Sequence, residues 1–161
     1  MTTPLIDTLT WNAAANEAVR EMIERRSTGQ SLETIRTFYD EMAARHQEPE
    51  IDEPIIAAMW SHFGSRCQAS AALLSGESLL WSNVIDTVIK KQRDYGKENI
   101  LRFGQFGLIV RVHDKLARLE HLIATGATPN NESRADTVLD LVGYAVLGVL
   151  LARNQFEYPL V

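Results

Sequence analysis

The sequence has a single cysteine, Cys67, among 161 residues, so an internal disulfide cannot form. A reducing, intracellular location fits this composition best. The first residues lack the charged stretch and apolar core of a signal peptide. The longest apolar run, residues 144–152, is too short to span a bilayer. We therefore expect a cytoplasmic protein that makes no contact with a membrane.

Positive charge is also scarce, since 16 Lys and Arg stand against 21 Asp and Glu, a formal net charge of -5. A sequence-independent DNA binder needs clustered cations, so direct binding to nucleic acid is disfavoured. The sequence has no GxxxxGKS phosphate loop, no GxSxG elbow and no CxxC pair, which disfavours the enzyme classes that depend on them. The four histidines show no metal-ligand spacing.

What the sequence does have is helical periodicity, in a chain long enough for a real core. Apolar residues recur at helical spacing in six segments, and no segment alternates with a period of two. The segments begin near positions 11, 32, 53, 78 and 99, and after Asn131 or Ser133. We predict an all-α bundle of about five or six helices.

Residue types that cap helices precede several of these segments: Thr10, Ser31, Asp52, and Asn131 or Ser133. The polar stretch 46–52 contains Pro49 and is predicted to be a linker. The inward face of the last helix is expected to hold Val138, Leu141, Val142, Ala145 and Val149.

Three acidic residues of the last helix, Glu132, Asp136 and Asp140, are spaced i, i+4 and i+8. This spacing places them on one side of a helix. Stacked carboxylates repel one another, and a Mg²⁺ ion with oxygen ligands would offset that repulsion. In the alternative, Glu132 complements the helix dipole and the two aspartates pair with arginines.

Three cations, Arg111, Lys115 and Arg118, share one face of the preceding helix at i, i+4 and i+7. Together they can hold a phosphate chain. Asp114 lies beside them and can neutralise Arg118 or bind a metal. The alternative is a solvated face of weak i, i+4 pairs.

A basic stretch over residues 90–97 ends a helix at Tyr95 and Gly96. A nucleotide base could stack on Tyr95 while Lys90 or Lys97 contacts phosphate. Equally, Gly96 can be a helix C-cap, with the basic residues complementing the helix dipole.

Four blocks in order resemble the nucleotide modification associated domain 1 family of phages and bacteria, over about residues 88–152. The blocks are KQRDYG (91–96), FGQFGL (103–108), RVHDKLARL (111–119) and ESRADTVLDLVGY (132–144). The resemblance implies a helical domain tied to nucleotide metabolism and DNA base modification.

The helical layout is also similar to the all-α nucleoside triphosphate pyrophosphatases of the MazG and dimeric dUTPase group. Those enzymes hold Mg²⁺ with an EExxE helix followed by an ExxD helix. Here the first helix offers Asp114 and Glu120, and the second reads ExxxDxxxD. The resemblance implies a MazG-like antiparallel core over residues 76–161, with residues 1–75 as a helical cover or dimerisation segment.

The leading hypothesis is therefore a homodimeric, Mg²⁺-dependent hydrolase or binder of (deoxy)nucleoside triphosphates, in the host cytoplasm if phage-encoded. Metal ligands would be Glu132, Asp136 and Asp140, completed by Asp114 or Glu120 as catalytic carboxylates. Substrate contacts would come from Lys90, Tyr95, Arg111, Lys115 and Arg118. The alternative is a non-enzymatic helical accessory or inhibitor protein that binds a host or modification enzyme, with its partner surface on residues 1–75.

Overall fold

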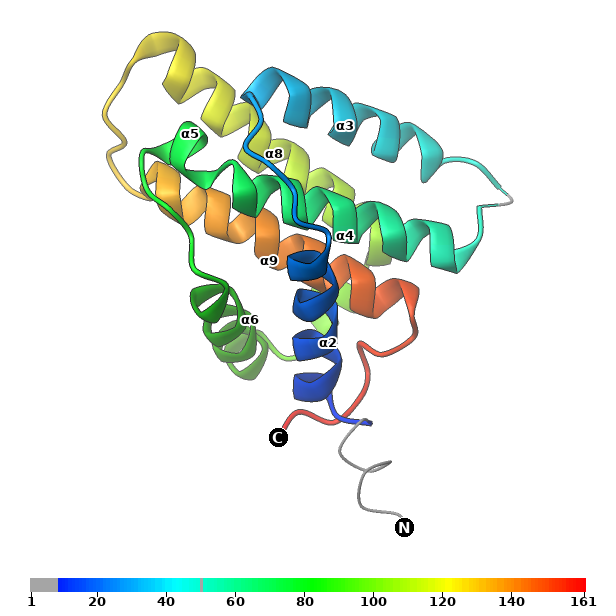
Figure 1. Cartoon of the computed structure of the whole chain (residues 1–161). Helices are drawn as coiled ribbons and strands as arrows, with labels where there is room; N and C mark the ends of the chain where they lie inside the picture. Colours follow the sequence, from blue (N-terminus) through cyan, green and yellow to red (C-terminus); the bar gives the residue numbers. More distant parts are fainter. Residues whose placement is uncertain (1–8, 50) are drawn as a thin grey trace.

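A computed structural model describes residues 9–49 and 51–161, and these contain eight α-helices and no strand. The predicted all-α class is confirmed (Figure 1). The helices are α2 (Trp11–Glu24), α3 (Leu32–Arg45), α4 (Glu53–Ala69), α5 (Ala71–Ser75), α6 (Trp81–Tyr95), α7 (Glu98–Leu101), α8 (Gly104–Thr125) and α9 (Arg134–Ala152). Residues 1–8, the start of the predicted N-terminal segment, and residue 50 of the predicted linker lie outside the described residues.

Helix ends follow the predicted caps at three places. The hydroxyl oxygens of Thr10, Ser31 and Ser133 accept hydrogen bonds from the backbone N–H three residues later, at 3.1, 3.2 and 3.0 Å. Asp52 occupies the cap position of α4, but its side chain makes no capping hydrogen bond. The predicted start of α6 at Ser78 is wrong, because the helix begins at Trp81.

The described helices outnumber the predicted ones because two long segments are broken. Ser70 leaves helical geometry between α4 and α5, and its hydroxyl oxygen accepts the backbone N–H of Gln30 at 2.8 Å. Gly104 has φ +54°, a backbone conformation that favours glycine, and separates α7 from α8. Each break turns one predicted helix into two.

The centre of the bundle is α9, which runs antiparallel to α4 and α8 (Figure 1). Its predicted inward residues, Val138, Leu141, Val142, Ala145 and Val149, are all at most 1% exposed. They share one core with residues of α2 and α4, including Trp11, Trp60 and Phe63. Residues from both predicted segments, 1–75 and 76–161, thus bury apolar surface against each other.

By length and composition, α9 is apolar enough to cross a membrane, which the shorter run noted in the sequence did not suggest. In this structure eleven of its residues are buried, and α9 packs against α4 and α8. A helix at the centre of a soluble bundle is surrounded by other helices, so it must also be apolar on most sides. Length and composition alone therefore decide nothing about a membrane.

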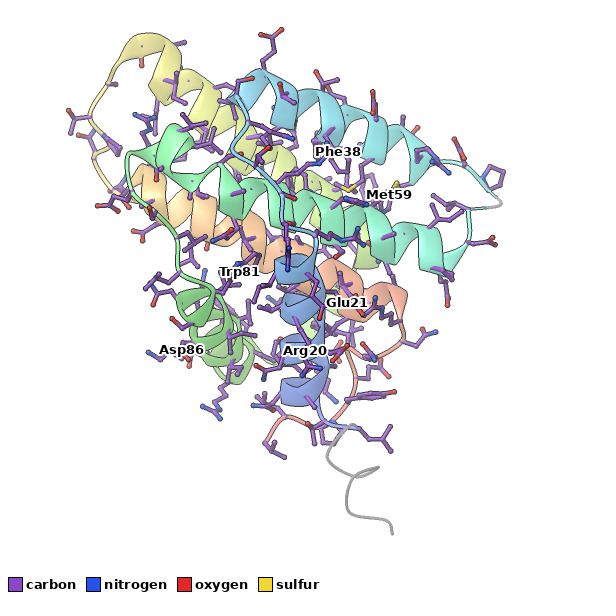
Figure 2. All side chains as sticks on the ribbon, in the orientation of Figure 1. Arg20, Glu21, Phe38, Met59, Trp81 and Asp86 are labelled. Carbon is purple, nitrogen blue, oxygen red and sulfur yellow. The ribbon has the colours of Figure 1, made fainter. Side chains whose placement is uncertain are left out.

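On the outside of α4, α3 adds a layer of aromatic contacts. Phe38 and Met59 lie between these two helices (Figure 2). The ring of Phe38 stacks on Phe63 with centroids 6.3 Å apart, and the guanidinium of Arg66 lies 4.4 Å from the centre of the Phe38 ring. Next to this layer, the Tyr39 hydroxyl of α3 donates to the backbone carbonyl of Ile109 in α8 at 2.7 Å and holds α3 beside α8.

Candidate functional site

Where α8 faces the start of α9, the predicted basic and acidic faces meet as ion pairs. Lys115 Nζ lies 3.0 and 3.1 Å from the two carboxylate oxygens of Glu132. Arg118 donates to Thr137 Oγ1 at 2.6 Å and to the backbone carbonyl of Glu132. Thr137 in turn donates to Glu132 Oε2 at 2.8 Å. These contacts join the first turn of α9 to α8.

One turn further along α9, Asp140 is held between two lysines. Lys91 Nζ lies 2.7 Å from Asp140 Oδ1, and Lys115 Nζ lies 2.8 Å from Oδ2. The Asp140 side chain is 10% exposed, whereas that of Lys91 is 52% exposed. Lys91 comes from α6, so this aspartate connects α6, α8 and α9. We call Lys91, Asp140, Lys115, Glu132 and Arg118 the ion-pair network.

Within this network, the charges of Lys91, Lys115 and Asp140 are stable near neutral pH. Burial works to raise the pKa of Asp140, but hydrogen bonds from Lys115 and Lys91 outweigh it and hold that pKa below its ordinary value. Burial also works to lower the pKa values of both lysines, but their contacts with Asp140 outweigh it and raise them. All three groups therefore stay ionised.

We expect Asp140 to contribute to stability in a pH-dependent way. Because its pKa is lower in the folded chain than in the unfolded chain, its contribution is present above the unfolded value and is lost as the pH falls through the folded value. Asp140→Asn should lower the free energy of unfolding at neutral pH by about 1 kcal/mol. Urea titrations of both proteins between neutral and strongly acidic pH measure this difference. A difference that does not shrink on acidification would contradict the assignment.

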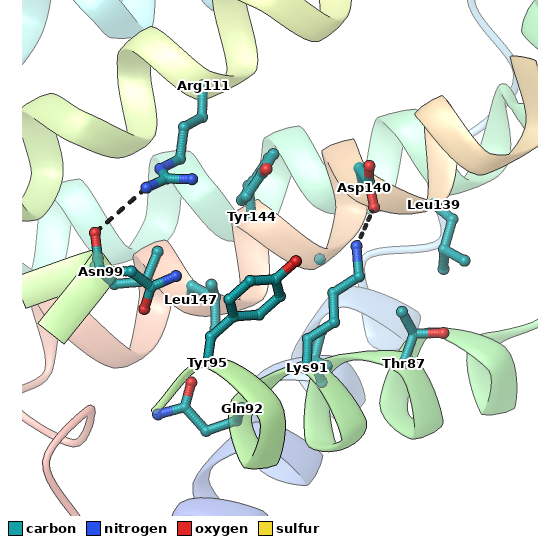
Figure 3. Close-up of a pocket in the computed structure, with 13 residues that line it drawn as sticks. Thr87, Lys91, Gln92, Tyr95, Asn99, Arg111, Leu139, Asp140, Tyr144 and Leu147 are labelled. Atoms are coloured by element: carbon teal, nitrogen blue, oxygen red, sulfur yellow. Dashed lines mark hydrogen bonds and ion pairs between the residues drawn. The ribbon is translucent and has the colours of Figure 1, made fainter. Parts of the chain in front are cut away.

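A pocket of about 170 Å³ lies beside the network, between α6, α7, α8 and α9 (Figure 3). Its apolar lining comes from Val88, Ile100, Leu139, Gly143 and Leu147. Its polar and aromatic lining comes from Thr87, Lys91, Gln92, Tyr95, Asn99, Arg111, Asp140 and Tyr144. The ion pair between Lys91 and Asp140 thus forms part of the pocket wall.

Three of the residues predicted from the sequence line this pocket: Tyr95, Arg111 and Asp140. Tyr95 is 68% exposed and stands over the pocket. Arg111 Nη2 donates to the backbone carbonyl of Asn99 at 3.3 Å. Lys115, Arg118 and Glu132 lie in the ion-pair network behind the pocket wall.

The other predicted residues lie outside the pocket. Lys90, Asp114 and Asp136 are exposed and make no ion pair with another described residue. Glu120 pairs with Arg36 of α3, with Arg36 Nη2 to Oε1 at 2.5 Å and Nε to Oε2 at 3.3 Å. The proposed catalytic pair of Asp114 and Glu120 is therefore not assembled with Asp140.

The described residues contain no group of three or more His, Cys, Asp or Glu side chains placed to hold a metal ion. Glu132 and Asp140 are engaged by lysines, and Asp136 points to solvent from the first turn of α9. As arranged here, the three carboxylates do not fit a Mg²⁺ site, and no catalytic step is assigned to them. The Mg²⁺ site stays a prediction from the sequence.

Several polar and aromatic residues of the pocket are not among the predicted site residues: Thr87, Lys91, Gln92, Asn99 and Tyr144. Of these, Lys91 belongs to the basic stretch 90–97 noted in the sequence. Lys90 was chosen over its neighbour, yet Lys91 stands one helical turn before Tyr95 and therefore shares its face. The same rule places Thr87 and Val88 on that face. On α9, the same i, i+4 spacing places Asp140 and Tyr144 on one face. The i, i+4 rule applied from Tyr95 and Asp140 would have found this lining.

Comparisons with family models, with curated proteins and with solved structures found no match to this chain, so its resemblance to the nucleotide modification family remains a prediction from the sequence.

Proposed function

We propose that this chain binds a nucleoside phosphate in the pocket between α6 and α9. The observation that carries the proposal is a local excess of positive charge. The charged side chains that line the pocket are Lys91, Arg111 and Asp140, a formal charge of +1. Lys115, Arg118 and Glu132 of the ion-pair network, outside the lining, add another +1, in a chain whose net charge is -5. An anionic ligand is attracted to such a pocket.

The remainder of the lining suits the other half of a nucleotide. Tyr95 and Tyr144 flank the pocket, and their rings can stack on a base. Val88, Leu139 and Leu147 supply apolar surface. A cavity of about 150 Å³ accommodates benzene, so about 170 Å³ accommodates one ring. The sugar and phosphates would then remain near the open side, within reach of Lys91.

Binding is better supported than hydrolysis by the arrangement of the carboxylates. Both oxygens of Asp140 accept contacts from lysines, and Asp114 and Glu120 lie outside the pocket. A nucleoside triphosphate carries Mg²⁺ on its own phosphates in solution, so the proposed complex needs no protein-held ion. Mg²⁺-dependent hydrolysis can be measured in the same binding experiments, as release of pyrophosphate or phosphate.

The experiment is a thermal-shift series with deoxynucleoside triphosphates, with and without Mg²⁺. We expect wild-type protein to be stabilised, by about 2.7 kcal/mol when the nucleotide is present at 100 times its Kd. Lys91→Gln should weaken binding about tenfold, because one phosphate contact with a cation is lost. Lys90→Gln removes the same charge one residue earlier, outside the pocket, and should bind like wild type.

Equal losses in the Lys91 and Lys90 variants would show that only net charge matters and would remove the pocket from the proposal. Absence of any shift in wild-type protein would instead favour the non-enzymatic accessory function. Release of pyrophosphate or phosphate during the same incubations would extend the proposal from binding to hydrolysis.

A further inference from the structure

Two side-chain amides in the pocket lack hydrogen-bond partners. Gln92 is 7% exposed, and its carboxamide makes no hydrogen bond with any described residue. The Oδ1 atom of Asn99 is buried and also has no partner. Leaving a buried polar group unpaired is unfavourable, and most such groups in proteins are satisfied. The Oδ1 atom of Asn99 is such a group, whereas the carboxamide atoms of Gln92 still touch solvent in the pocket and are free to pair with a ligand.

Their position separates them from the ion pair of Lys91 and Asp140, while Arg111 donates to the backbone carbonyl of Asn99. Figure 3 shows Gln92, reaching from α6, and Asn99, from α7, on the side away from Asp140 and Leu139. Tyr95 and Tyr144 lie between the two ends. The pocket therefore has an amide end and an acid–lysine end, with aromatic rings between them.

The chemistry of the amides restricts what can occupy their end. The Gln92 carboxamide offers N–H donors and a carbonyl acceptor side by side, so it can pair with a ligand group that presents both. Phosphate oxygens at neutral pH are mainly acceptors, so a phosphate group cannot donate to the carboxamide oxygen of Gln92. The edge of a nucleotide base presents an N–H donor beside an acceptor, and glutamine side chains pair with such edges.

We infer that Gln92 recognises the edge of a nucleotide base that enters this pocket between the two tyrosines. The inference rests on the proposed function and adds an orientation to it. The base lies at the amide end, and the phosphates lie toward Lys91. Gln92 is then a specificity-determining residue, because a base whose edge mismatches its carboxamide leaves buried groups unpaired.

The test compares wild type with Gln92→Met, which keeps the side-chain length and removes the amide. Calorimetric titrations use dATP, dGTP, dCTP, dTTP, dUTP, ribose 5-phosphate and inorganic pyrophosphate. We expect Gln92→Met to weaken the best nucleotide by at least about tenfold, and to reduce the preference among bases. The affinity for pyrophosphate should stay within about twofold, because the phosphate contacts are intact.

A stability measurement separates recognition from a structural role. Replacing an amide that has no partner in the protein by an apolar side chain of similar size should leave the urea midpoint equal or higher. A lower midpoint would show that Gln92 supports the fold, and would overturn the inference. So would an unchanged nucleotide affinity in the variant, or ribose 5-phosphate binding as tightly as the best nucleotide.

These results are distinguishable from failure of the proposed function itself. If wild type binds nucleotides and Gln92→Met binds them equally well, the proposed function stands and the base-edge inference falls. If wild type binds none of the nucleotides, both fall together.

Discussion

Gly148→Ala is expected to lower the free energy of unfolding by about 2 kcal/mol. A Cβ atom at position 148 would lie 2.4, 2.5 and 2.6 Å from Trp60 Cδ2, Cγ and Cδ1. Overpacking of this kind costs about 1–3 kcal/mol, and three ring atoms in conflict place it near the upper end. Alanine gains about 1 kcal/mol over glycine inside a helix, which offsets part of the loss.

The Trp60 ring cannot easily move aside to make room. It is fully buried, and its Nε1 donates to Gln105 Oε1 at 2.6 Å. Gln105 Nε2 donates to the backbone carbonyl of Gly148 at 3.1 Å. Trp60, Gln105 and Gly148 therefore connect α4, α8 and α9 in one contact. Shifting the ring would break that connection as well.

Gly143→Ala is the matched control for this prediction, because it makes the same change on the same helix. A Cβ atom there would meet only Val88 Cγ1, at 3.4 Å, which is ordinary van der Waals contact. Its stability should equal that of wild type or exceed it by up to about 1 kcal/mol. Urea denaturation of the three proteins measures the difference. Equal stability of Gly148→Ala and wild type would contradict the described packing of α4 on α9.

Filling the pocket from Gly143 is expected to have the largest effect on binding. Gly143 and Val88 both line the pocket, so a larger side chain at position 143 takes up its volume. Gly143→Leu should weaken nucleotide binding by about 100-fold, because a ring no longer fits beside Tyr144. Gly143→Ala should have a smaller effect in the same direction. Calorimetric titration with the best-binding nucleotide measures both.

The urea midpoint of unfolding shows whether a loss of binding in Gly143→Leu comes only from loss of the fold. Gly143→Leu must unfold near wild type for its loss of binding to report on the pocket. If it does not, the graded loss in Gly143→Ala, which the packing around Val88 tolerates, carries the comparison. Wild-type affinity in a folded Gly143→Leu protein would place the ligand elsewhere.

The fold class could be predicted from the sequence because helical spacing is a local property. Ser31 and Ser133 stand next to apolar stripes, and both cap the helices that follow them. The break at Ser70 could not be predicted, because that residue interrupts the helix while its hydroxyl oxygen accepts from Gln30, forty residues away. Long-range contacts of this kind leave no mark in a local pattern.

The candidate site was only partly predictable for a similar reason. Lys115 and Glu132 do meet, but Glu132 lies before the cap residue Ser133 and not on a face of α9, as its spacing predicted. Spacing also cannot tell an ion pair from a ligand site. Glu120 was grouped with the pocket because α3, which carries its partner Arg36, lies far away in sequence. Gln92 was missed because burial of a single polar side chain depends on how α6 packs on α9.

The most direct test of the account is a ¹H–¹⁵N correlation spectrum of wild-type protein titrated with a deoxynucleoside triphosphate and Mg²⁺. Bound nucleotide should shift the amide resonances of Lys91, Gln92, Tyr95 and Tyr144, together with the side-chain amides of Gln92 and Asn99. Resonances of α3 should stay in place, because that helix contributes no residue to the pocket. An unchanged spectrum at millimolar nucleotide, or shifts confined to residues outside the pocket, would contradict the central claim.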